Sequence, residues 1–137
     1  MRFLFIIISF FSSNLLISQE NTFIRTYNLP GMQGGLALAI MEDGGFVGTG
    51  QHNDNGCKTY AYRIDECGNI LWFNLFNDGG GVAIDDTHDK GVIIAQDGGR
   101  VLKIDSLGIP EWEKNYTDIS SYMTSVIQLS DNSFFMG

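Results

Sequence analysis

Residues 62–72 read YRIDECGNILW, and residues 102–112 repeat the pattern as LKIDSLGIPEW. The Asp, Gly and Trp of the two stretches align at a spacing of 40 residues. A self-similar period of this length is typical of a protein that stacks one supersecondary unit per repeat. The fold is therefore best understood from one repeat and its copies.

A second phrase recurs three times, as EDGGFV at 42–47, HDKGVI at 88–93 and SDNSFF at 130–135. Its spacings are 46 and 42 residues. Two independent phrases share nearly the same period and keep the same order, which makes chance similarity a poor explanation.

Each repeat divides into four short apolar segments separated by turn residues, the pattern of four β-strands. The first repeat predicts strands at 36–41, 46–51, 59–65 and 70–76, and the second predicts them at 82–86, 92–96, 100–105 and 110–116. A third repeat starts near Met123 and stops at Gly137.

Several of these strands are apolar on both faces, including ILWF at 70–73 and VIIA at 92–95. An antiparallel sheet with one wet face would alternate instead. Small antiparallel sheets covered on both sides and repeated along the chain are what β-propeller blades require. The sequence thus predicts an all-β protein made of four-stranded antiparallel blades of a β-propeller.

The predicted propeller is incomplete. The blades span 36–76 and 82–116, a partial blade spans 122–137, and an orphan fourth strand lies at 22–27. That makes about two and a half blades, whereas propellers typically use four to eight. We expect the chain to be an N-terminal fragment, or a truncated product, of a larger protein.

Residues 1–18 have the pattern of a signal peptide, with one positive charge at Arg2 followed by an apolar run. The run is too short and too interrupted by Ser and Asn for a permanent transmembrane helix, which needs about 20 apolar residues. Cleavage after Ser18 would leave residues 19–137 as a partial repeat domain. We expect a secreted or cell-surface protein with no permanent membrane span.

The composition describes a folded chain of acidic character. Hydrophobic residues make up 44% and charged residues 18%, which excludes a disordered chain. The formal charge of −8 argues against a nucleic-acid partner. The partners left as possibilities are a protein or glycan ligand and the missing blades of the parent protein.

The two cysteines, Cys57 and Cys67, flank a predicted strand. An extended strand at 59–65 would hold them more than about 20 Å apart, beyond the reach of a disulfide. Free thiols, or pairing with cysteines outside this chain, are expected.

Repeated polar and aromatic residues are best explained by packing and turn chemistry. Trp72 and Trp112 stand at the same place in successive repeats, which predicts packing between blades. Asp65 and Asp105 precede a Gly-bearing turn, where a carboxylate accepts backbone N–H bonds. An active site needs a unique set of groups, not one copy per repeat.

No catalytic, cofactor-binding or metal-ligating residue is assigned. The oxygen-rich segments 85–89 and 53–55 miss the register of a calcium loop, although calcium remains the alternative to a solvated turn. His52 and His88 lie in different repeats without further ligands at zinc spacing. The glycines at 79–81 open no helix, and no nucleophile elbow occurs.

The repeats resemble those of secreted Bacteroidota proteins that often carry a C-terminal sorting domain for the type IX secretion system. The likeness rests on DGGF at 43–46, KIDSLG at 103–108 and EWEK at 111–114. It covers residues 22–137 and implies export, but the family lends no catalytic residue. A weaker similarity links the Asp-to-Trp phrase to quinoprotein propellers. The phrase departs from their pattern because Asp65 precedes Gly68 by three positions and not by four, and because the Ala and Thr of that pattern are missing.

The expected function is an exported, noncatalytic scaffold or binding module of a larger secreted or cell-surface protein. The alternative is a fragment of a propeller enzyme, polysaccharide-active or quinone-dependent, with its catalytic residues in missing blades. A nonrepeated cluster of polar residues would favour a specific site.

Overall fold

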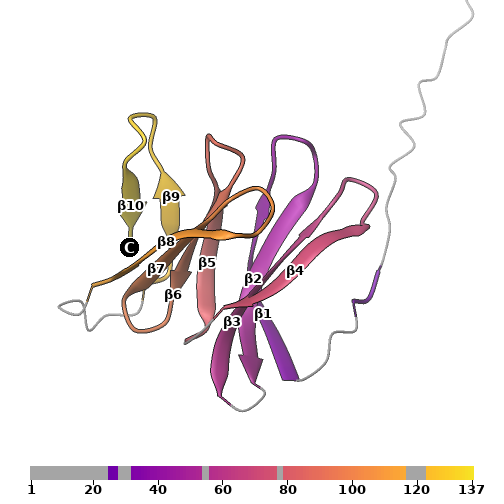
Figure 1. Ribbon diagram of the computed structural model, residues 1–137, viewed down its shortest axis with the longest axis horizontal. Coiled ribbons are helices and arrows are strands. Elements are labelled where there is room, and N and C mark those ends of the chain that lie inside the picture. Colours follow the sequence, from indigo (N-terminus) through magenta and orange to yellow (C-terminus); the bar gives the residue numbers. More distant parts are fainter. Residues whose placement is uncertain (1–24, 28–31, 54–55, 77–78, 117–122) are drawn as a thin grey trace, which may run out of the picture.

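The computed structural model describes residues 25–27, 32–53, 56–76, 79–116 and 123–137, and every regular element in these ranges is a β-strand. The strands form three antiparallel sheets that stand side by side in chain order (Figure 1). The first sheet has the order β1(Met32–Ile40), β2(Phe46–Asn53), β3(Cys57–Ile64) and β4(Ile70–Phe76). The second has the order β5(Gly81–Asp86), β6(Val92–Gln96), β7(Arg100–Ile104) and β8(Pro110–Asn115). The third pairs β9(Val126–Gln128) with β10(Phe134–Met136).

The predicted all-β class and the four-stranded antiparallel sheets are confirmed. Strands β2 to β8 lie close to their predicted ranges, and β1 begins four residues earlier than predicted, at Met32. The predicted leader lies outside the described residues. So do residues 22–24 of the predicted orphan strand, and residues 25–27 are not assigned to a strand.

The repeat is visible in the pairing register. A register shift separates Gly35 from Ala37 in the first sheet, and another separates Gly81 from Ala83, 46 residues on, in the second. A second pair of shifts lies at residues 63–64 and 103–104. A bulge bends a strand and increases its twist. The two sheets therefore carry the same bends at equivalent positions.

The turns repeat as well. The N–H groups of Met41, Thr87 and Leu129 donate to carbonyls four residues ahead, at 2.9, 3.0 and 2.8 Å. The next-to-last turn residue is left-handed each time, as Gly44 (φ 79°), Lys90 (φ 67°) and Asn132 (φ 67°). Glycine and asparagine adopt this conformation readily, so the DGG and SDN phrases were true turn signals.

Two apolar cores lie between the sheets. The first joins Val47 and Ala61 of the first sheet to Ile84, Ile94 and Leu102 of the second. The second core lies on the opposite face of the second sheet, where Ile93, Ala95 and Val101 meet Met123 and Val126 near the third. Strand β6 is buried along its whole length, as its continuous apolar run predicts.

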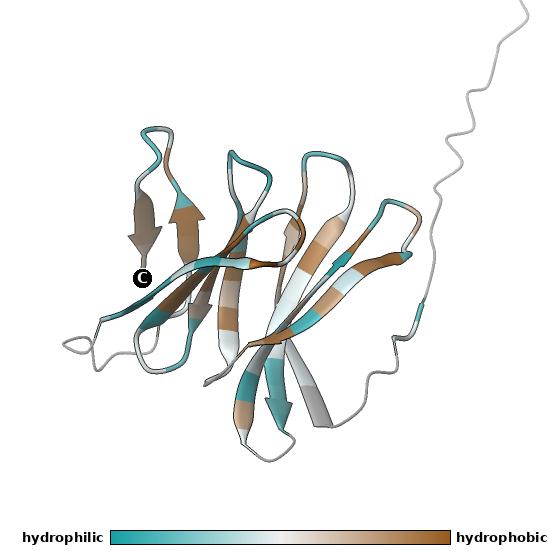
Figure 2. Cartoon of the chain, in the orientation of Figure 1, coloured by the Kyte–Doolittle hydropathy of each residue, from teal (hydrophilic) through white to brown (hydrophobic). Residues whose placement is uncertain are grey.

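Within the described residues, another sheet covers only one face of the first sheet, although Tyr27 lies beside Tyr62 on the other face and Tyr60 there is buried. Its other face carries Leu38, Ile40, Tyr60, Tyr62, Phe73 and Leu75, which share one side by the pairing register. We call these six residues the leading face. Several are exposed, Leu38 to 58% and Ile40 to 68%. The expectation that residues 70–73 would be covered on both sides is therefore not met by the described part of the chain. Figure 2 shows that hydrophobic residues continue along β4, an edge strand of the first sheet.

Candidate functional site

A polar seam joins the first two sheets at the turn between β7 and β8. Trp72 Nε1 donates to the Ser106 carbonyl at 3.0 Å, and Arg63 Nη1 reaches the same oxygen at 3.3 Å. Asn74 Nδ2 donates to the Gly108 carbonyl at 3.0 Å. Trp72 also packs against the first core. Its predicted role in packing between repeats is confirmed, with the addition of a hydrogen bond.

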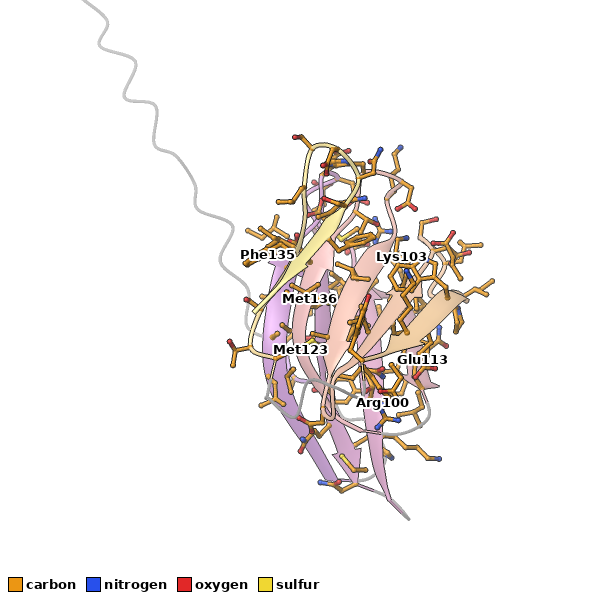
Figure 3. The ribbon with its side chains drawn as sticks, turned by 90° about the vertical axis from the view of Figure 1, so that its left-hand side faces the viewer. Arg100, Lys103, Glu113, Met123, Phe135 and Met136 are labelled. Carbon is orange, nitrogen blue, oxygen red and sulfur yellow. The ribbon has the colours of Figure 1, made fainter. Side chains whose placement is uncertain are left out.

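Trp112 has the equivalent place on the second sheet. Its ring meets Phe134 edge-on with the centroids 5.7 Å apart, and Lys114 Nζ lies 5.1 Å from the ring centroid. Figure 3 views the molecule from the side of the third sheet, with Phe135 and Met136 in front. Both tryptophans thus pack onto the next sheet along the chain.

The turn before β4 receives the same kind of donor as the turn before β8. Arg25 Nη1 donates to the Gly68 carbonyl at 3.0 Å, and the Tyr27 hydroxyl donates to it at 2.7 Å. Gly68 and Gly108 are 40 residues apart and are equivalent in the repeat. Arg25 therefore does at the first sheet what Asn74 does at the second. Segment 25–27 contacts the first sheet much as β4 contacts the second.

The leading face carries an aromatic row. The rings of Tyr60 and Tyr62 lie 6.2 Å apart, Tyr60 and Phe73 lie 5.9 Å apart, and Tyr27 lies 6.3 Å from Tyr62. Burial raises the pKa of both the Tyr60 and the Tyr62 hydroxyls, with a further rise from the neighbouring tyrosine. The phenols are neutral at physiological pH, so the face is apolar in character.

Each of the first two sheets ties a cation to the aspartate of its first turn. Arg63 Nη2 lies 2.6 Å from Asp43 Oδ2. Lys103, whose side chain is only 4% exposed, lies 3.0 Å from Asp89 and 2.7 Å from Glu111. Burial tends to raise the pKa of Asp89, but hydrogen bonds from Thr87, Lys103 and the Gly91 N–H outweigh it and lower the pKa to about 2. The recurrence of the pair indicates a structural role.

The predicted turn role of the repeated aspartates is also confirmed. Asp65 accepts the Asn69 N–H at 2.7 Å, and Asp105 accepts the N–H groups of Leu107 and Ile109 at 2.9 and 2.8 Å. The hydrogen bond from the Asn69 N–H is the main cause of the lowered pKa of Asp65.

The acidic segment 85–89 does not converge on one point. Asp85 accepts the Gln128 N–H at 3.3 Å, whereas Asp89 is held by Lys103. His52 is buried in β2, and exposed His88 contacts Asn132 at 3.1 Å. Among the described residues, no three His, Cys, Asp or Glu side chains gather as a metal site. Residues 54–55 of the second oxygen-rich segment lie outside the described ranges.

Cys57 and Cys67 are exposed and do not form a disulfide. No helix of the described chain is long and apolar enough to cross a membrane. Gly79 adopts a left-handed conformation (φ 78°) just before β5 and accepts a hydrogen bond from Thr59. The glycines at 79–81 therefore belong to the link between two sheets.

Two clefts lie between the first and second sheets. One, of about 240 Å³, is lined by turn residues that include Asp43, Arg63, Asp86 and Lys90. Its charges are mixed, and Arg63 is already paired with Asp43. The other, of about 290 Å³, is lined by Leu75, Phe76, Gln96, Leu102, Pro110, Glu111, Trp112 and Glu113. Sequence reasoning missed this second cleft because its residues come from four strands and share no motif.

Comparison with known proteins supports the fold and nothing finer. The sequence matches no protein-family model and no curated protein. Among solved structures, the chain is similar to Sqt1 from Chaetomium thermophilum, with a TM-score of 0.56 at 12% identity. The match covers 74% of this chain and 29% of that protein. The chain thus spans less than a third of the length of the structure it matches.

Proposed function

We propose that the sheets are blades of a β-propeller and that the chain serves as an exported, noncatalytic scaffold or recognition module of a larger protein. The observation that carries this proposal is the leading face. Leu38 and Tyr62 of this face occupy the repeat positions of Ile84 and Leu102, which the second sheet buries against the first, so this part of the face is suited to being covered by another sheet of the same kind. The contacts of segment 25–27 with Gly68 support the same view.

The export part of the proposal rests on the leader-like residues 1–18 and on the resemblance to Bacteroidota repeat proteins of the type IX secretion system. The repeated Asp and Trp residues have structural roles in turns, cores and the seam, so they need not be explained as catalytic residues. The partners of the leading face are then further blades of the parent protein.

Residues 19–137, purified alone, test this proposal. We expect self-association or a noncooperative thermal transition, because an uncovered apolar face and open sheet edges favour association. Light scattering with size-exclusion chromatography and calorimetry would detect both. A monomer with one cooperative transition would contradict the proposal.

A pair of leucine variants makes the test specific. Leu38→Lys places a charge in the middle of the leading face and should shift the protein toward monomer. Leu107→Lys changes a leucine that is 67% exposed on a turn outside that face, and it should leave the association unchanged. Equal behaviour of the two variants would mean that association does not use the leading face.

A further inference from the structure

The 290 Å³ cleft, which we call the β4–β8 groove, departs from the repeat at its polar positions. Gln96, Glu111 and Glu113 correspond to Gly50, Leu71 and Phe73 of the first repeat. Repeated residues in this protein serve turns, cores and seams. Polar residues that break the repeat inside one groove therefore call for a separate explanation.

Gln96 has an acceptor without a partner. Its side chain is 1% exposed, and its Nε2 donates to Thr59 Oγ1 at 2.8 Å. The Thr59 hydroxyl donates its only proton to the Gly79 carbonyl at 3.0 Å. With that proton on the Gly79 carbonyl, the contact with Thr59 is a hydrogen bond when Gln96 Nε2 faces Thr59, which places Oε1 on the other side of the amide. This Oε1 is itself buried, and it accepts no hydrogen bond from the described residues.

The charges of the groove are negative. Glu111 and Glu113 are its charged lining residues, and Glu113 of β8 (Figure 3) forms no ion pair within the described chain. Glu111 is shared with Lys103. Leu75, Phe76 and Leu102 supply apolar lining. A matching ligand needs an apolar stem and a cationic head with several hydrogen-bond donors, which describes an alkylammonium group.

The source of that group is suggested by the adjacent strand. β8 is an edge strand of the second sheet, so one row of its backbone groups has no neighbouring strand in the described chain. Such an edge can pair with an extended peptide. We propose that the β4–β8 groove binds a lysine side chain presented by an extended polypeptide partner. The proposal does not depend on ring closure, because all lining residues come from the first two sheets.

The test uses protein expressed from the full sequence and purified in the form that the cell produces, with or without residues 1–18. The probe is the capped peptide Gly-Leu-Lys-Leu-Gly, and the control peptide carries norleucine in place of lysine, which keeps the stem and removes the ammonium. Titration is followed by the side-chain amide signals of Gln96 in nitrogen-15 NMR spectra. A dispersed spectrum first shows that the sample is folded, so a folding failure is recognised separately.

We expect saturable shifts of the Gln96 signals with the lysine peptide and roughly tenfold weaker binding of the norleucine peptide, because charge-assisted hydrogen bonds are lost. Equal binding of the two peptides, or no shift at Gln96, would overturn the proposal. Butylammonium alone is a further probe. If it binds as tightly as the lysine peptide, the site is one for free amines and the polypeptide partner is wrong.

Two variants locate the contact. Glu113→Gln removes an exposed charge without touching the core and should weaken binding of the lysine peptide by about two- to fivefold. Glu66→Gln changes an exposed glutamate on a turn of the first sheet and should have no effect. Gln96→Met keeps the length of the side chain, removes the acceptor and should also weaken binding. Unchanged affinity in Glu113→Gln would remove the carboxylate from the site and overturn the proposed recognition of the ammonium.

Discussion

The leading face of the first sheet and the matching face of the second sheet occupy equivalent positions, but their central residues have different surroundings. Leu38 and Ile84 are 46 residues apart and pair with equivalent residues of the next strand. Leu38 is 58% exposed, whereas Ile84 is 8% exposed. The strands, bulges and turns are alike, so the difference comes from the neighbour. In a stacked repeat, burial is decided between units and not within one.

The sharpest test of this comparison truncates both side chains. Ile84→Ala should lower the free energy of unfolding by about 2–5 kcal/mol, because it leaves a cavity between two sheets. Leu38→Ala should change it by less than about 0.5 kcal/mol in protein whose leading face is free. Urea denaturation measures both. Similar losses in a monomeric sample would show that the leading face is covered after all.

The glycines of the turns give the next largest contrast. Gly108 and Gly44 are both left-handed, with φ of 81° and 79°. A Cβ on Gly108 would lie 2.9 Å from the Trp72 ring, whereas the nearest atom to one on Gly44 is 3.7 Å away. Gly44→Ala should therefore cost about 1–2 kcal/mol of backbone strain alone.

Gly108→Ala should cost about 1–3 kcal/mol more than that, because the seam between the sheets must also shift. Thermal unfolding of the two variants side by side gives the difference. If both lose the same stability, the seam accommodates a methyl group and is not closely packed.

The repeat phrases predicted the strands well because each strand is marked by its own residues. Turn glycines and the Asp of each turn are local signals, so Gly44, Gly68 and Gly108 could be placed without a structure. The exposed leading face could not be predicted in the same way. Residues 70–73 look like a doubly covered strand, and only the arrangement of neighbouring sheets reveals which face is open.

The β4–β8 groove was harder still to predict. Gln96 is a single polar residue at the end of an apolar strand. Its Oε1 has no partner because the amide binds Thr59, 37 residues away, through Nε2, and the Thr59 hydroxyl donates to Gly79. Comparing the two repeats position by position would have found one signal, because Gln96 replaces a glycine and Glu113 replaces a phenylalanine. That comparison marks a departure from the repeat but not the groove in which the departures meet.

Acid titration compares how much the ion pairs of the two sheets contribute to stability, and the expected effects are smaller than those of the glycine variants. The pKa of Asp89 is about 2 in the folded protein against a usual value of 3.8. A lowered pKa means that the charged form stabilises the fold above about pH 4, and that this stability is lost as the pH falls toward 2. Since Asp89 is 56% exposed, solvent screening limits the effect to about 0.5–1 kcal/mol.

Asp89→Asn should therefore flatten the loss of stability between about pH 4 and pH 2, as measured by urea denaturation at each pH. Asp43→Asn should flatten it as well, because hydrogen bonding to the Gly45 N–H and the charge of Arg63 lower the pKa of Asp43. An unchanged pH slope in Asp89→Asn would mean that the buried Lys103 is held by Glu111 alone.

The smallest expected effect concerns the donors at the two equivalent glycine carbonyls. Asn74→Ala removes the donor to Gly108 inside the seam and should cost about 1 kcal/mol. Arg25→Ala removes an exposed donor to Gly68 and should cost less than about 0.5 kcal/mol in the free chain. If another sheet covers the leading face, as we propose, Arg25 would be part of a seam like that of Asn74, and its truncation should approach the same cost. Measuring Arg25→Ala at low and high protein concentration separates these states, because association covers the face. A cost that stays small in the associated protein would mean that segment 25–27 does not lie at the contact, and the equivalence of the two carbonyls would then hold only within one chain.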